Sequence, residues 1–406
     1  MEFMKAANFR RIFIMAGIIS LFVSYLGIWI RFINDPVEST GSDFIAFYSA
    51  GRIAQREGAS NVYNPLLQQQ IQQKEVGFSL SPGQVLLYNH LPFLLPILQA
   101  IVNTSYVDSF YRWIFLLIMV YVAAIVILSR LLTLVEIDKN SILLISIGAF
   151  LFLPTFFSLM NGQDTAFLFL GIAIWMYGLF SGREVLSGLG LSLTTVRPQI
   201  ALFLAMPMLF RHAKVFWGFL LGSGILALFS VLILGLDGTK EFINILLIST
   251  RGEWHGMKEN AMYNLIGFLV RTVPQLKVGT IRAAGWIVYG VTLVGLCILW
   301  FKAQDLKGGL IGLTMTLALF VSPHLHFHDL TLLLIPIYEL IWTSRETGNL
   351  RTSIAIVLPI AISLLLLISN ISPYLQYTIP YLIMFLLALY PYYLKFRTPV
   401  TTLHQA

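Results

Sequence analysis

The chain has 406 residues, of which 57% are hydrophobic and 11% are charged, and its mean hydropathy is +0.81. A water-soluble fold of this composition would expose more apolar surface than water tolerates, so the chain is predicted to lie in a membrane. The net charge of +7 is spread over the ends of apolar runs; this pattern matches cytoplasmic loops and lipid headgroups and argues against nucleic-acid binding. The single cysteine, Cys297, excludes an internal disulfide.

Apolar runs recur along the whole chain, from Ile12–Ile30 near its start to Tyr381–Leu394 near its end. Each run approaches the roughly 20 residues that a helix needs to cross a bilayer. The runs are apolar on all sides and lack the alternation that is typical of a β-barrel strand. The sequence therefore predicts an all-α polytopic membrane protein, a single domain over residues 1–406 with about 11 to 13 transmembrane or re-entrant helices.

Positive residues place the start of the chain on one side of the membrane. Lys5, Arg10 and Arg11 precede the first apolar run, and cytoplasmic ends carry an excess of lysine and arginine. We therefore expect a cytoplasmic N-terminus in the cell (inner) membrane and an outer region over residues 34–85. Residues 44–57 within it form an amphipathic piece.

Two later segments are interrupted by proline. Tyr88–Val102 contains two prolines and is expected to dip into the membrane without crossing it. Val185–Phe210 breaks at Arg197–Pro198 and is expected to be a hairpin of two half-helices. Such breaks free backbone groups, which persist in a membrane only where protein or a watery cavity satisfies them. Both breaks therefore indicate a cavity.

A second outer region is expected over residues 237–278, where Met262–Val270 is amphipathic. With the N-terminus inside, nearly every unusual polar cluster of the chain falls on the outer side, which predicts a single site there. The remaining predicted spans cover residues 110–130, 141–158, 165–180, 214–236, 279–301, 308–322, 326–343, 352–370 and 374–394.

Asp43 follows the first helix and begins an amphipathic stretch. An aspartate at this position can cap a helix, because its side chain accepts hydrogen bonds from amides of the first turn. A carboxylate at the membrane surface can also act as a general base that takes a proton from an attacking hydroxyl. The two roles are compatible, and both are retained.

Arg197 lies beside proline with apolar residues on either side. A charge at such depth costs roughly 2.5 to 3.5 kcal/mol on insertion scales, so it is expected to have a partner and a role. The planar guanidinium suits phosphate oxygens and stays charged in a dry site. The alternative is a structural ion pair with Asp164 or Asp329.

His324, His326 and His328 alternate with apolar residues and are followed by Asp329. On a regular helix the middle histidine would point elsewhere, so all three converge only if the backbone is irregular, as Pro323 allows. Contacts to a phosphate or a sugar are the preferred interpretation, with interfacial packing as an alternative. A divalent metal such as zinc is a further alternative, but no fourth ligand with recognisable spacing is visible.

Asn161, Gly162, Gln163 and Asp164 separate two apolar runs. Turn chemistry alone would explain the Asn-Gly pair, with Asp164 near the start of the next helix. The alternative is that Gln163 and Asp164 contact sugar hydroxyls. We extend this second hypothesis, contact with the sugar or the acceptor, to Tyr48, Asn161, Gln199 and Asp329.

Six motifs follow one another in a fixed order: Asp43–Ala50, with the pattern Asp-Phe-x-x-Phe-Tyr-x-Ala; Gly58 with Val62–Pro65; Tyr88–Pro92; Asn161–Gln163; Arg197–Gln199; and Ser322–Asp329. Together they resemble glycosyltransferase family 87, the polyprenyl-phosphate-mannose-dependent mannosyltransferases of bacterial envelopes. That family lies within the C superfamily of membrane glycosyltransferases. The likeness spans about residues 40–340. Position 164 departs from the family pattern, being aspartate where relatives commonly carry asparagine.

The resemblance implies an inverting transfer of mannose or another sugar from a polyprenyl phosphate to a lipid or glycan acceptor, without an essential metal or other cofactor. It implies that Asp43 is the base and that phosphate contacts fall on Arg197 and on His324, His326 or His328. A secondary transporter or lipid flippase is the rival from another class, because broken helices also mark substrate pathways. A superfamily member with another acceptor, such as lipid A or a protein, is a third possibility.

Overall fold

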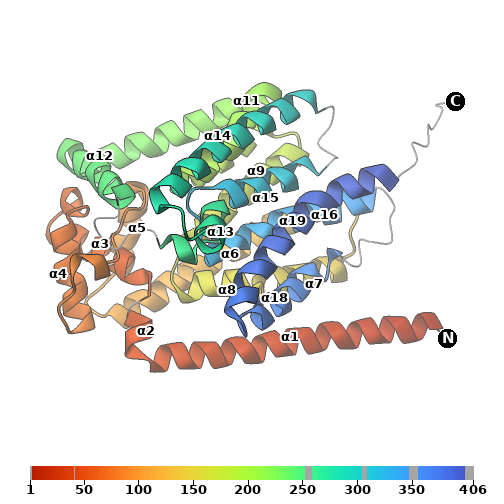
Figure 1. Cartoon of the computed structure of the whole chain (residues 1–406), viewed down its shortest axis with the longest axis horizontal. Coiled ribbons are helices and arrows are strands. Elements are labelled where there is room, and N and C mark those ends of the chain that lie inside the picture. The colour runs from red at the N-terminus through yellow and green to blue at the C-terminus, as the bar shows by residue number, and fades with distance from the viewer. Residues whose placement is uncertain (1, 41, 252–257, 304–308, 347–354, 398–406) are drawn as a thin grey trace.

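The computed structural model describes residues 2–40, 42–251, 258–303, 309–346 and 355–397. Every regular element in these residues is a helix, which confirms the predicted all-α fold. Figure 1 shows the longer helices running roughly along one axis, with the start of α1 and the end of α19 at one end of the bundle. Helices from the segment that follows α1, labelled α2 to α5, gather at the opposite end.

Four of the described helices are long and apolar enough to cross a membrane, and a bent pair forms a fifth candidate. These helices confirm a polytopic membrane protein, while the count of 11 to 13 stays a prediction. The bent pair meets at 46°, and Pro154 is the second residue of its second helix. The five are α1 (Glu2–Asn34), α6 (Tyr106–Thr133), α12 (Ala213–Arg251), α14 (Val278–Lys302), and α7 (Lys139–Phe150) with α8 (Leu153–Met160).

The remaining bundle elements are shorter. The predicted span 326–343 was expected to be one helix, but it begins as a 3-10 helix, which Pro323 and the polar residues after it favour over an α-helix. The shorter elements are α9 (Thr165–Phe180), α10 (Glu184–Ser192) with η4 (Leu193–Val196), α11 (Pro198–Arg211), α15 (Leu310–Val321), η6 (Phe327–Leu333), α16 (Leu334–Glu346), α18 (Leu358–Ser369) and α19 (Pro373–Arg397).

The chain turns back at Arg197, as the proline predicted. Pro198 is the first residue of α11, and Arg197 has a non-helical backbone. The start of α10 and the end of α11 meet again, because Nδ1 of His212 lies 2.8 Å from Oε1 of Glu184. The two short helices therefore run in opposite directions, which confirms the hairpin and places Arg197 at its tip.

The segment Pro36–Ile101 forms a helical layer at the far end of the bundle. The amides of Gln68 and Gln72 hold its extended part, since they bond to the backbone at Tyr88 and Leu86. The layer consists of α2 (Pro36–Thr40), α3 (Phe44–Arg56), η1 (Ala59–Asn61), α4 (Pro65–Val76), η2 (Pro82–Gln84), η3 (Pro92–Leu94) and α5 (Leu95–Ile101).

The structure adds detail to two expectations for the outer regions. Residues 44–57 were expected to be amphipathic; within them, Phe44–Ala54 is buried on every side, because α4, α5 and α6 pack around α3. The second outer region, 237–278, is largely helical, because α12 continues beyond a kink at Gly235 (φ 67°). Within it lie η5 (Glu259–Ala261) and α13 (Leu265–Thr272), while residues 252–257 fall outside the described chain.

Tyr88–Val102 was predicted to dip into the membrane without crossing it, and the length of its helix agrees with that prediction. Its helical part, Pro92–Ile101, is one of the shorter apolar helices. A helix of that length is too short to cross a bilayer, which requires roughly 20 residues.

Helices α10 and α12 approach closely at glycine. A Cβ at Gly188 would lie 2.2 Å from the carbonyl oxygen of Val215 and 2.8 Å from Cα of Gly218. We expect Gly188→Ala to destabilise the protein by about 1–3 kcal/mol, because the backbones would have to separate. The matched control is Gly224→Ala, where nothing lies within 4 Å of the added Cβ. Thermal unfolding in detergent would test this; equal midpoints for the two variants would contradict it.

Candidate functional site

Asp43 occupies the N-cap position of α3, yet its side chain makes no capping hydrogen bond to the described first turn. Instead, its Oδ2 accepts a 2.6 Å hydrogen bond from Nε2 of Gln163. Gly162 makes this approach feasible, because it has φ 67° and an added Cβ would lie 2.8 Å from Cβ of Phe44. The turn that was predicted around Asn-Gly therefore joins α8 and α9 to α3 and brings Gln163 to Asp43.

Asp164 is fully buried at the start of α9 and makes no capping bond with that helix. Its Oδ1 lies 3.0 Å from Nη2 of Arg197, and its Oδ2 lies 2.7 Å from Nδ1 of His90. Burial raises the pKa of Asp164, but the charge of Arg197 and the neighbouring His90 lower it more, so the pKa lies well below its usual range. The carboxylate stays ionised and holds both partners.

Arg197 lies between two buried carboxylates. Its Nε is 3.7 Å from Oδ1 of Asp329, and its Nη2 also donates a weaker 3.4 Å bond to Oε1 of Gln163. Arg197 was expected, as one alternative, to form a structural ion pair with Asp164 or Asp329. In the structure it pairs with both. Through Gln163 the arginine is also linked to Asp43.

Asp329 is fixed by the 3-10 helix that contains it. Its Oδ1 accepts from Oγ1 of Thr165 at 3.2 Å, and its Oδ2 accepts from the backbone N–H of His326 at 3.3 Å. Nε2 of His328 lies 3.6 Å from the same carboxylate. These contacts connect η6 to the start of α9.

The three histidines converge, as the irregular backbone after Pro323 predicted. The ring centroids of His324 and His326 are 4.6 Å apart, and those of His326 and His328 are 5.8 Å apart. Burial and the nearby His326 and Arg197 lower the pKa of His324 to about 3, so its ring is neutral at pH 7. Nδ1 of His324 is buried without a hydrogen-bond partner in the described chain.

The residues that were predicted to contact the sugar or the acceptor lie at different distances from this cluster. Gln199 joins the cluster, because its Nε2 donates to the carbonyl of His324 at 3.4 Å. Asn161 ends α8 next to the turn. Tyr48 is turned away: it is buried, and its hydroxyl donates to Glu75 at 3.2 Å and to the Thr104 carbonyl at 3.4 Å.

Sequence reasoning missed His90 as a site residue. The centroid of its ring lies 4.5 Å from that of Phe47, which belongs to α3, and 5.4 Å from that of Tyr88. The available signal was its place inside the Tyr88–Pro92 motif, where a polar residue precedes an apolar stretch. Its carboxylate partner lies 74 positions away, a separation that no local pattern indicates.

No group of three or more metal-ligating side chains is placed to hold an ion within the described ranges. The imidazoles of the cluster instead contact one another and Asp329.

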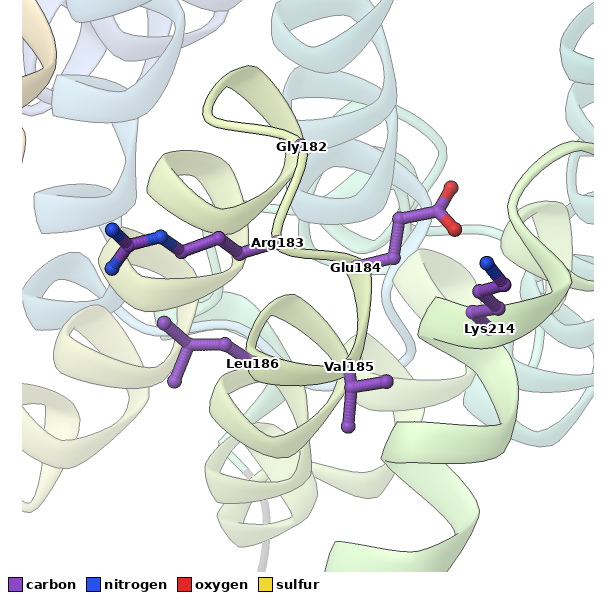
Figure 2. Close-up of a pocket in the computed structure, with 6 residues that line it drawn as sticks. All are labelled: Gly182, Arg183, Glu184, Val185, Leu186 and Lys214. Carbon is purple, nitrogen blue, oxygen red and sulfur yellow. The ribbon is translucent and has the colours of Figure 1, made fainter.

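A separate cavity of about 290 Å³ lies where α9 meets α10 and α12, lined by Gly182–Leu186 and Lys214. Figure 2 shows Glu184 on the side of Lys214, whereas Arg183 points away from both. Because α9 runs from Asp164 at one end to this cavity at the other, the cavity is not part of the candidate site.

A sequence model of glycosyltransferase family 87 matches residues 90–323, which is more than half of the chain. The matched stretch begins at His90 and includes Gln163, Asp164 and Arg197. No curated protein matches the chain.

The pKa of His324 predicts how stability depends on pH. An unfolded histidine titrates near pH 6.5, so below that pH the unfolded chain binds a proton that the folded protein does not, and stability falls until the folded pKa of about 3. From about pH 6.5 to about pH 5 this loss is roughly 2 kcal/mol. We expect His324→Gln to reduce the loss, and His212→Gln at the other end of the bundle to retain it.

Thermal unfolding in detergent across this pH range measures both variants. An acid slope for His324→Gln as steep as that of the unaltered protein would contradict the prediction.

Proposed function

The chain belongs to glycosyltransferase family 87, and from this membership and the geometry of its site we propose that it transfers a sugar from a polyprenyl phosphate to a lipid or glycan acceptor. The observation that carries the proposal is the hydrogen-bonded chain from Asp43 through Gln163 to Arg197. It sets a carboxylate that can take a proton beside a cation that can attract a phosphate. Mannose is the first sugar expected, with other hexoses or pentoses as alternatives.

In this proposal Asp43 is the general base. Its Oδ2 is held by Gln163, while Oδ1 has no hydrogen-bond partner in the described residues and is available for the acceptor hydroxyl. The acceptor oxygen attacks the anomeric carbon from the face opposite the phosphate as its proton passes to Asp43. The bond between the anomeric carbon and the phosphate oxygen breaks, and the configuration inverts.

The leaving group is a polyprenyl phosphate that gains one negative charge as that bond breaks. Fixed donors that face a developing charge usually contribute most to catalysis. Arg197 supports this role, because its carboxylate partners hold the guanidinium in place while its Nε keeps no hydrogen-bond partner among the described residues. Nδ1 of His324 is a second unpaired polar atom at the same site.

The sugar would lie between the base and the phosphate. Gln163 and Gln199 carry amides at that position, and each can bond to hydroxyls. Both oxygens of Asp164 already contact Arg197 and His90, so we assign it a positioning role in place of the sugar contact that was expected.

The chemistry is proposed for the outer face of the inner membrane. The basic N-terminal residues support a cytoplasmic start, and the site lies at the end of the bundle to which α1 leads. A lipid donor would reach this end laterally from the bilayer. No nucleotide is required, because the donor is already activated by its phosphate.

A transporter or flippase remains the alternative from another class. Transporter sites usually lie near the midplane of the membrane, between repeats. Here the site lies at the end of the bundle that holds α2 to α5, because Asp43 directly precedes α3. Lipid movement in liposomes without any sugar transfer would favour the transporter.

The donor class is tested by incubating the purified protein with radiolabelled polyprenyl-phosphate sugars and a membrane extract. We expect label from one such donor to pass into a lipid or glycan product, and none to pass from the matching nucleotide sugar. Transfer from the nucleotide sugar alone would contradict the proposal.

We expect Asp43→Asn to lower the rate of transfer by between about a hundredfold and ten-thousandfold, because the amide cannot accept the proton. Folding and donor binding should persist, since the amide oxygen can still accept from Gln163. Asp108→Asn is the control, because that carboxylate is exposed in the first turn of α6. Turnover of Asp43→Asn equal to that of the control would remove Asp43 from the mechanism.

A further inference from the structure

We propose that His90 is a donor-binding residue: held by Asp164, it presents Nε2 to the donor phosphate and takes up a proton as the phosphate binds. The inference rests on the proposed function, because it concerns the same donor. It assigns a role to a side chain outside the five residues first expected to serve as base or phosphate contacts, and it makes donor binding depend on pH.

The geometry fixes which nitrogen of His90 faces the ligand. Nδ1 lies 2.7 Å from Oδ2 of the ionised Asp164, so Nδ1 carries a hydrogen and donates it. Nε2 has no partner in the described part of the chain, because the bond to Asp164 is the only one made by the ring. Phe47 and Tyr88 pack against the ring and prevent it from turning. An imidazole held in this way is suited to accept a proton at Nε2.

The charges of the site show why a proton is needed. Asp43, Asp164 and Asp329 are three carboxylates, and Arg197 is the one arginine that contacts this cluster in the described residues. An anionic phosphate would enter a site where the negative charges already outnumber the fixed positive charge. An added negative charge within about 4–6 Å favours the charged form of a histidine. Uptake of a proton by an imidazole would therefore offset the charge of the donor.

His90 is better placed for this uptake than the predicted histidines His324 and His326. Those two rings contact each other, so a charge on one opposes a charge on the other. The groups that face His90 are Asp164 at its Nδ1, Arg197 behind that carboxylate, the phenol ring of Tyr88, and Tyr63, whose hydroxyl donates to the carbonyl of His90 at 2.7 Å. Phe47 is the contact from α3 and carries no charge.

The proton balance is simple. In the proposed binding step, His90 takes one proton from solvent at Nε2, and that N–H then donates to a phosphate oxygen. No covalent bond forms or breaks in this binding step. After sugar transfer the same imidazolium faces a phosphate that has gained a negative charge, and it stabilises the product side of the reaction.

The test is titration calorimetry of the full-length protein in detergent with a polyprenyl phosphate, repeated in buffers of different ionisation enthalpy. The dependence on the buffer gives the number of protons taken up. We expect net uptake by the unaltered protein near neutral pH, and none when the uncharged polyprenol of the same length is used.

Two substitutions separate the titrating role from packing. His90→Asn keeps a donor toward Asp164 and removes Nε2; we expect it to lose most of the proton uptake and to weaken phosphate binding by about ten- to a hundredfold. His90→Gln places an amide N–H near the position of Nε2; we expect it to recover part of the affinity without the uptake. His212→Asn is the matched control, because His212 makes the same kind of 2.8 Å contact with Glu184 at the other end of the bundle.

Unchanged uptake in His90→Asn, or binding by the unaltered protein without any uptake, would overturn the inference while leaving the proposed donor class in place. An unaltered protein that binds no polyprenyl phosphate would overturn both. Reduced uptake in the His212→Asn control would also count against His90, because the protons would then be bound elsewhere.

Discussion

The structure of this membrane glycosyltransferase depends on one guanidinium held between two buried carboxylates. Arg197 contacts Asp164 and Asp329 from the tip of a helical hairpin, so three separate parts of the chain meet at one charge. Removing one member of such a buried group leaves an uncompensated charge, which costs roughly 3–5 kcal/mol. Because each of these buried charges needs its partner, the ion pairs also fix the start of α9, the tip between η4 and α11, and η6 relative to one another.

Around that centre, close backbone approach determines where the remaining polar groups lie. Gly162 allows α3 to approach the turn before α9, and Nε1 of Trp113 donates to the carbonyl of Gly162 at 2.7 Å. Gln163 follows directly and bridges Asp43 to Arg197. A side chain larger than hydrogen at position 162 would separate Asp43 from Arg197. The arrangement of these polar groups therefore depends on packing that involves no charged atom.

Several of these features could be predicted from the sequence because their causes are local. The break at Arg197–Pro198 follows from proline, and the convergence of His324 with His326 follows from the irregular backbone after Pro323. Other features could not be predicted, because their causes are distant in the chain. The pattern of α3 is amphipathic, but neighbouring helices bury all of its first 11 residues, and the partner of His90 lies 74 positions away.

The distribution of charge also explains why a lipid phosphate could be a substrate without being held too tightly. A site with several unpaired cations would bind the product phosphate, which is more negative than the donor, and would release it slowly. Here the guanidinium is already matched by carboxylates, so the remaining attraction comes from polar atoms that make no hydrogen bond within the described chain, such as Arg197 Nε and His324 Nδ1. Hydrogen bonds of this kind stabilise the charge during bond cleavage.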